Sequence, residues 1–221
     1  MIKIFKVKNK KNIYSNITFE KHNKNHAIRS YNSYLKKKIL SEFYDIIKNF
    51  NVRVILSGGT LLGCIRENNF IEWDDDIDLE LYRDEFNSII HNLMQKLTQK
   101  NFEYYANLTE PWEKISIYKE DQKIQIGTLY KNKEYMITRI RKIPAYLFDN
   151  PKKIIFKNMD FYVPNPPEKF LNHVYINWNK PIKSDVDIEY LKSSYYRLGY
   201  FYKIKYRIKQ IIKIVFKKII K

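Results

Sequence analysis

The chain has 221 residues, 44% hydrophobic and 16% aromatic, which is enough to bury a domain core and excludes a protein that is disordered by composition. Its formal net charge of +17, from 41 Lys and Arg against 24 Asp and Glu, favours anionic partners but does not choose among nucleotides, phosphorylated glycans, nucleic acid and acidic membranes. The single cysteine, Cys64, excludes intramolecular disulfides and cysteine-based zinc sites.

Periodic patterns begin after a polar and basic N-terminal arm at residues 1–28. Apolar residues spaced by three and four predict a helix from Ser30 to Phe50. The β-branched run VRVIL at 52–56 predicts a buried strand. A glycine turn at 57–60 then leads directly into a second helical pattern, so this region predicts a strand, a tight turn and a helix start.

The remaining elements extend a sheet. Residues 76–81 alternate carboxylates with apolar side chains and predict a half-buried strand, and a helix is expected from Arg83 to Lys100. Short alternating runs at 102–163 predict several antiparallel strands, and a helix is expected near 170–175. These patterns predict one α/β (α+β) domain at 29–194, a mixed sheet flanked by helices, followed by a basic amphipathic helix at 195–221.

The segment WDDDIDLE at 73–80 carries five carboxylates, whose mutual repulsion is costly unless a cation compensates it. Asp76 and Asp78 point the same way on a strand and can share one hard divalent ion. Mg²⁺, or Mn²⁺ in its place, suits carboxylate oxygens and keeps positions open for phosphate oxygens. The alternative is a solvated acidic loop, which the apolar residues flanking the aspartates disfavour. Trp73 in this segment is more typical of a core residue than of one that stacks on a base.

Gly58 and Gly59 form the second half of the predicted site. Glycine lets backbone N–H groups approach an anion closely, and the helix that follows directs its positive end at the same point. A simple strand-to-helix turn is the alternative. A diglycine turn together with an Asp-x-Asp strand is typical of nucleotide-handling folds.

The segments GGTLLGCIR at 58–66 and FIEWDDDID at 70–78 resemble the signature of LicD-type phosphotransferases, a group that includes fukutin-related proteins. A weaker similarity to the closing motif of that family lies in residues 162–181, so the resemblance spans about residues 55–182. It implies a nucleotidyltransferase-like fold. It also implies transfer of phosphocholine, or a related phospho-alditol group, from a CDP-linked donor to a glycan hydroxyl of the lipopolysaccharide, capsule or teichoic-acid type.

The resemblance places the metal on Asp76 and Asp78, which are the expected catalytic residues, and assigns the glycine turn and Arg66 to the same site. We expect an in-line displacement at phosphorus that releases CMP, driven by positioning and charge neutralisation. The predicted site has a metal set and a phosphate set: Asp74, Asp76 and Asp78 for the metal, and Gly58, Gly59, Thr60, Arg66 and Asp75 for the donor.

The chain departs from the family pattern at two positions. Glu72 stands where the family usually has proline before the tryptophan. Gln125, in the run IQIG, stands where a third carboxylate is expected. Glu80, Asp121 or Glu120 could replace that carboxylate. Two alternatives therefore remain open: a nucleotidyltransferase acting on a small molecule, protein or RNA, and a non-catalytic binding protein of the same fold.

The tail at 203–221 alternates an apolar stripe at helical spacing with eight Lys or Arg and contains no acidic residue. This pattern is typical of a helix on an anionic membrane surface, which would suit a glycolipid acceptor, but also of a helix docked on its own domain. No nucleic-acid motif is present, so specific nucleic-acid binding is not expected. The N-terminal sequence lacks the apolar run of a signal peptide, so we expect a cytoplasmic protein, or a peripheral one at the inner face of the membrane if the tail binds lipid.

Overall fold

The computed structural model describes residues 32–108, 113–138 and 141–181, together with four short strands within residues 3–19. The strands β1 (Lys3–Phe5) and β4 (Ile17–Phe19) pair with each other, as do β2 (Lys8–Asn9) and β3 (Asn12–Ile13), and they fall in the predicted arm. The predicted tail at 195–221 lies outside the described residues.

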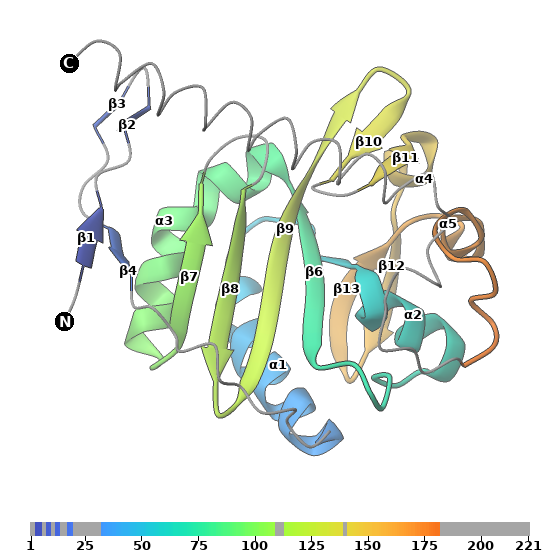
Figure 1. Cartoon of the computed structure of the whole chain (residues 1–221), viewed down its shortest axis with the longest axis horizontal. Helices are drawn as coiled ribbons and strands as arrows, with labels where there is room; N and C mark the ends of the chain where they lie inside the picture. Colours follow the sequence, from blue (N-terminus) through green and yellow to red (C-terminus); the bar gives the residue numbers. More distant parts are fainter. Residues whose placement is uncertain are drawn as a thin grey trace, which may run out of the picture.

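The described core alternates helices and strands in the order expected for an α/β chain (Figure 1). The elements are α1 (Ser33–Ile47), β5 (Ile55–Leu56), α2 (Gly58–Glu67), β6 (Asp76–Tyr82), α3 (Arg83–Gln99), β7 (Glu103–Asn107), β8 (Lys114–Lys119), β9 (Gln122–Asn132), β10 (Tyr135–Ile137), β11 (Lys142–Pro144), α4 (Tyr146–Asp149), β12 (Lys152–Phe156), β13 (Met159–Val163) and α5 (Pro167–Val174).

The strands form one mixed sheet of nine, in the order β11-β10-β9-β6-β5-β13-β12, with β8 and β7 added at the first half of β9. The expected mixed sheet is therefore confirmed. Most neighbours are antiparallel, as predicted for the second half of the chain. Two pairs are parallel, β6 with β9 and β5 with β13, because their connections cross over through other elements.

Helices α1 and α3 pack together against one face of the sheet (Figure 1). The apolar spacing that predicted α1 buries Ile39, Phe43 and Ile47 on this face. The helix starts at Ser33 rather than Ser30, because the Asn32 side chain accepts a hydrogen bond from the Leu35 amide at 2.9 Å and caps it there. Helices α2 and α5 lie together at the end of the sheet opposite β7.

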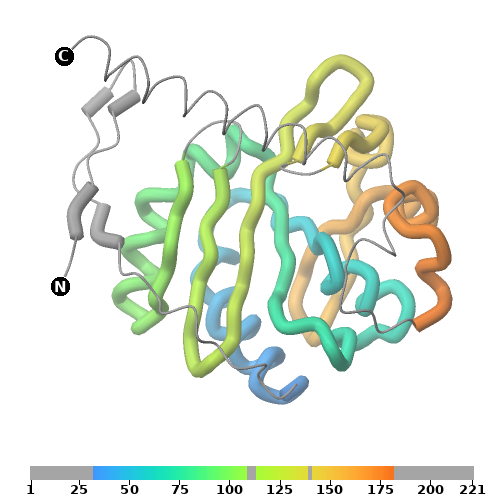
Figure 2. The backbone as a smooth tube through the Cα atoms, in the orientation of Figure 1, coloured from blue at the N-terminus to red at the C-terminus, as the bar shows by residue number. Residues whose placement is uncertain are grey.

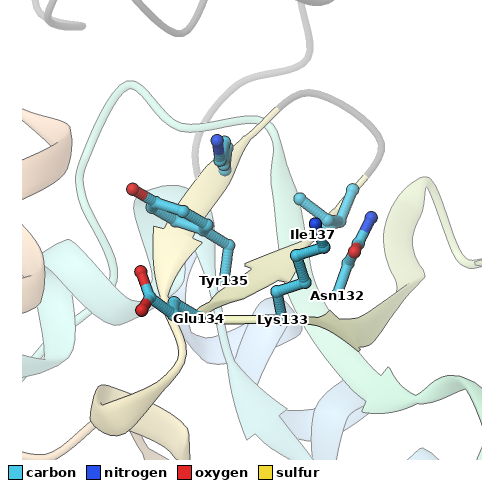
Figure 3. Close-up of a pocket in the computed structure, with 6 residues that line it drawn as sticks. Asn132, Lys133, Glu134, Tyr135 and Ile137 are labelled. Atoms are coloured by element: carbon cyan, nitrogen blue, oxygen red, sulfur yellow. The ribbon is translucent and has the colours of Figure 1, made fainter.

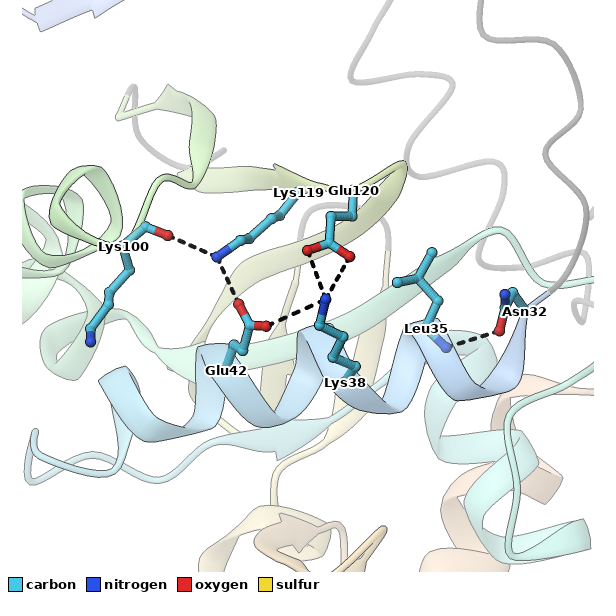
Figure 4. Close-up of polar contacts among 7 residues, drawn as sticks. All are labelled: Asn32, Leu35, Lys38, Glu42, Lys100, Lys119 and Glu120. Atoms are coloured by element: carbon cyan, nitrogen blue, oxygen red, sulfur yellow. Dashed lines mark hydrogen bonds and ion pairs between the residues drawn. The ribbon is translucent and has the colours of Figure 1, made fainter.

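Ion pairs tie α1 to the β8–β9 turn (Figure 4). Lys38 Nζ donates to both carboxylate oxygens of Glu120 at 2.8 Å, and Lys119 Nζ lies 2.7 Å from the Glu42 carboxylate. Glu120 is therefore directed to the helix-covered side of the sheet and is occupied there, which argues against it as the third carboxylate of the predicted site.

Among the described residues, the structure contains no helix with the length and apolar character that a membrane crossing requires.

Candidate active site

The turn from β5 into α2 is fixed to the acidic strand β6 by two hydrogen bonds. The Ser57 amide donates to the Asp78 carbonyl at 3.0 Å, and the Asp78 amide donates to Thr60 Oγ1 at 2.9 Å. Gly58 has a φ of +50°, in the left-handed region that glycine adopts without strain. The two segments that the sequence singled out therefore meet in one place.

Both glycines of the turn lie directly against aspartate side chains. A Cβ added at Gly58 would stand 2.7 Å from Asp78 Cγ, and one added at Gly59 would stand 2.8 Å from Asp74 Cγ. Only glycine leaves room for these carboxylates. The structure thus brings Gly58, Gly59, Asp74 and Asp78 together around the N-terminus of α2, whose positive end favours negative charge.

The acidic side chains form a cluster that fits a divalent cation. Asp74, Asp75 and Asp76 each present a carboxylate oxygen within 4.8 Å of the others. Asp78 follows on the same face of β6 as Asp76, as the alternating burial of this strand shows. Asp75, which the sequence placed in the phosphate set, is part of this group, whereas the predicted metal ligand Asp78 is not among the three carboxylates that lie within 4.8 Å of one another.

Two of these carboxyl groups, those of Asp74 and Asp78, are buried, and burial disfavours their charged forms. It raises the pKa of Asp74 to about 8, and the neighbouring charges of Asp76 and Asp78 contribute to this increase. It also raises the pKa of Asp78 to about 7, again with a contribution from Asp76. Carboxylates held together in this way favour a bound cation, because a cation offsets both the burial and the repulsion. The donor set therefore fits Mg²⁺ or Mn²⁺.

Two lysines balance part of this charge. Lys123 Nζ lies 2.6 Å from Asp76 Oδ2, and although burial lowers the pKa of Lys123, this contact raises it overall above the ordinary value. Lys36 is only 2% exposed, and its ammonium donates to the main-chain carbonyls of Asp74 at 2.5 Å and Asp76 at 3.1 Å. Lys36 thus holds the backbone of the acidic loop through main-chain carbonyls.

Gln125 lies beside Asp78, its register partner on β9, in the place where a third carboxylate was expected. Glu80, two residues beyond Asp78, is a buried carboxylate on the same face of β6. Burial raises the pKa of Glu80, while the charge of Arg141 and a hydrogen bond from Ser57 act in the opposite direction. Of the three substitutes considered from the sequence, Glu80 is the one that shares the strand and face of Asp78.

Arg66 and Trp73 lie differently from what the sequence suggested. Arg66 is in the last turn of α2, about 12 Å along the helix axis from Gly58, and it contacts Glu67 and the Trp178 carbonyl. The structure does not bring it to the glycine turn. The expectation that Trp73 is a core residue was wrong: it is 38% exposed and stands in a turn of the connection between α2 and β6. The path of this connection can be followed in Figure 2.

Arg141, which precedes β11 and is 9% exposed, was not among the residues predicted from the sequence. Its charge lowers the pKa of both Asp78 and Glu80 against the effect of burial, so the guanidinium lies near the acidic strand. No local pattern marked it, since its proximity to β6 arises from the pairing of β9, β10 and β11.

An open hollow of about 540 Å³ lies on the β9–β10 hairpin and its β11 neighbour (Figure 3). It is lined by Lys133, Glu134, Tyr135 and Lys142 among others, and the Lys142 ammonium stands 3.8 Å from the centre of the Tyr135 ring. None of the predicted site residues lines it.

Comparison with known proteins decides the family. The family model described as LicD/FKTN/FKRP, nucleotidyltransferase domain, matches residues 51–166, more than half of the chain. The chain belongs to this family. The resemblance found in the sequence is thereby confirmed, and the mixed sheet flanked by helices is the fold of a LicD/FKTN/FKRP nucleotidyltransferase domain. The match includes the glycine turn, the acidic strand and Arg141.

Two relatives illustrate the range of similarity within this family. The lipopolysaccharide cholinephosphotransferase LicD of Haemophilus influenzae is 42% identical over 52 residues, which cover 24% of this chain and 20% of that protein. An uncharacterised Rickettsia prowazekii protein is 27% identical over 152 residues, 65% of this chain and 54% of that protein. The chain therefore aligns with about half or less of the length of these curated relatives.

A solved Thermotoga maritima protein, described as a candidate nucleotidyltransferase, aligns with 87% of this chain and 99% of its own at 16% identity, with a TM-score of 0.41.

Proposed function

We propose that this LicD/FKTN/FKRP-family chain is a metal-dependent transferase that moves phosphocholine, or a related phospho-substituent, from a CDP-activated donor to a hydroxyl of a cell-surface glycan. The observation that carries the proposal is the contact between the diglycine turn and the carboxylates of Asp74 and Asp78. It joins an acidic cluster that fits a cation to a helix N-terminus suited to phosphate. The name of the Haemophilus relative supports the transferred group and the lipopolysaccharide type of acceptor.

The site residues divide the work between holding a cation and positioning phosphate. Asp76 and Asp78 would hold Mg²⁺ or Mn²⁺, with Asp74 and Asp75, whose carboxylates cluster with that of Asp76, as further ligands. The bound ion supplies neutralisation of the negative charge that develops on the diphosphate oxygens. Backbone N–H groups at Gly58, Gly59 and Thr60 orient a phosphate at the start of α2.

The reaction is a displacement at the phosphorus nearest the transferred group. The acceptor hydroxyl oxygen forms a bond to that phosphorus, the bond to the bridging oxygen breaks, and CMP leaves. The hydroxyl proton passes to a base or to water. Most of the acceleration in such a transfer comes from positioning and electrostatic stabilisation. The turn and the strand β6, which two hydrogen bonds join, would supply the positioning.

The products separate this proposal from its alternatives. The chain, supplied with Mg²⁺, CDP-choline and related CDP-linked donors, and a panel of glycans, should release CMP and transfer phosphocholine or its relative. Transfer of the nucleotide half to the acceptor would instead identify a nucleotidyltransferase. Binding of donors without turnover would identify a non-catalytic binding protein, the alternative that Gln125 beside Asp78 favours.

The basic segment at 203–221 extends the proposal to a membrane-associated acceptor. Its charge and apolar stripe suit the cytoplasmic face of an anionic bilayer, where a glycolipid acceptor would be presented. Truncation after Leu198 should reduce binding to vesicles containing anionic lipid and leave binding of CDP-choline unchanged. Unchanged vesicle binding would contradict membrane association through this segment.

A further inference from the structure

Arg141 is a buried cation on a fixed piece of backbone. It lies at the connection between β10 and β11, where its amide donates to Thr138 Oγ1 at 3.1 Å and its carbonyl accepts from the Thr138 amide at 2.9 Å. Only 9% of the residue is exposed. These two hydrogen bonds hold the backbone from which the Arg141 side chain extends.

The guanidinium group lies near two carboxylates without pairing with them. Its charge acts on both Asp78 and Glu80, yet among the described residues its buried Nε has no hydrogen-bond partner and it forms no ion pair. Lys123, in contrast, makes an ion pair with Asp76 at 2.6 Å. A cation present only to neutralise the cluster would be expected to pair in the same way.

A buried guanidinium donor without an acceptor is unfavourable unless a ligand supplies one. Arginine matches phosphate in particular, because its planar fork can donate two parallel hydrogen bonds to one phosphate group. The other anion-binding feature, the N-terminus of α2, also adjoins Asp78 through Gly58. Both features therefore converge on the carboxylate that is expected to hold the cation.

We propose that Arg141 binds the diphosphate of the donor and provides the arginine contact that Arg66, at the far end of α2, is not placed to make. This inference rests on the proposed function, because the ligand is the donor of that reaction. Arg141 would donate hydrogen bonds to those phosphate oxygens that contact neither the cation nor the N-terminus of α2. Arg141 would make no contact with the nucleoside part of the donor.

Calorimetric titration with CDP, CMP and cytidine in the presence of Mg²⁺ tests this assignment. Arg141→Gln should weaken binding of CDP by about tenfold to a hundredfold, the size expected for losing charge-assisted hydrogen bonds. Binding of cytidine should be unchanged. The CDP affinity of Arg141→Lys should lie between those of the natural chain and Arg141→Gln, since lysine keeps the charge but lacks the planar fork of donors. Arg53→Gln, a control on the surface pair with Glu85, should bind CDP like the natural chain.

A purely structural role for Arg141 would lower the thermal midpoint without changing the ratio of CDP to cytidine affinity, and that result would overturn the proposal. Loss of CDP binding in Arg66→Gln but not in Arg141→Gln would also overturn it. If Arg141→Gln does not fold, as judged by circular dichroism, Arg141→Lys carries the test. A lysine variant that binds CDP as tightly as the natural chain would then count against Arg141 as a phosphate ligand.

The two proposals can fail separately. If the natural chain binds neither CDP nor CDP-choline, the CDP donor is wrong, and inorganic pyrophosphate with Mg²⁺ replaces CDP in the same comparison. Pyrophosphate binding that is lost in Arg141→Gln would keep Arg141 as a phosphate ligand for a different donor. The inference would be overturned if the natural chain and Arg141→Gln bound pyrophosphate equally, or if neither bound it.

Discussion

The side chain of Asp78 lies against the Cα of Gly58, so closely that a methyl group on that glycine would stand 2.7 Å from Asp78 Cγ. This contact joins the start of α2 to the acidic face of β6. Substitution of Gly58 can test this contact, because the lack of space and the φ of +50° both disfavour a larger residue.

Gly58→Ala should therefore weaken Mg²⁺ binding strongly and lower the free energy of unfolding by about 1–3 kcal/mol, from backbone strain and the clash with Asp78. Gly127→Ala is the matched control, since a Cβ there would meet Glu80 Cγ at an ordinary 3.9 Å. Chemical denaturation and metal titration measure the two effects. A Gly58→Ala chain with unaltered metal affinity would show that the contact is dispensable.

Asp78→Asn should abolish transfer and reduce Mg²⁺ affinity at least tenfold, because the amide removes the negative charge while keeping the shape and the backbone hydrogen bonds of Asp78. Asp160→Asn, on the exposed pair with Lys153, should leave both quantities unchanged. Mn²⁺ binding followed by electron paramagnetic resonance gives a readout independent of turnover. Retained turnover in Asp78→Asn would refute the metal assignment.

Mg²⁺ should stabilise the fold more at high pH than at low pH. Folding raises the pKa of Asp74 from 3.8 to about 8 and that of Asp78 from 3.8 to about 7. The folded state therefore binds more protons than the unfolded chain between these values, so without a cation the free energy of unfolding falls as pH rises across this window. Bound Mg²⁺ compensates the ionised carboxylates. Thermal midpoints in EDTA and in excess Mg²⁺ should differ most near about pH 8.5 and least near about pH 5; a difference independent of pH would contradict this linkage.

Lys36→Met should weaken Mg²⁺ binding by about tenfold or more, because the acidic loop loses the donor that holds the carbonyls of Asp74 and Asp76. Lys36→Arg should restore part of the affinity. The neighbouring Lys37→Met, at an exposed position of α1, removes the same charge without touching the loop and should bind Mg²⁺ normally. Equal affinities in the Lys36→Met and Lys37→Met chains would show that only overall charge matters.

The local elements of the site could be predicted from the sequence. Apolar spacing indicated α1 and α3, and the alternation of Asp76, Asp78 and Glu80 with apolar residues indicated which face of β6 carries the carboxylates. The glycine turn and its helix were equally evident, because short-range sterics decide where Gly58 and Gly59 are needed. Family membership followed from these same residues.

Other features depend on long-range pairing, which local patterns do not encode. The parallel register of β6 with β9 places Gln125 beside Asp78 and Lys123 beside Asp76. Arg141 comes near Asp78 only because β10 and β11 continue the sheet from β9. Arg66 shares the sequence motif with Gly58 but lies at the other end of a helix, so proximity in sequence misplaced it. The sequence by itself thus indicated which carboxylates and glycines belong to the candidate site. The tertiary structure decided which positively charged side chains lie near them, because strand register and helix length set those distances.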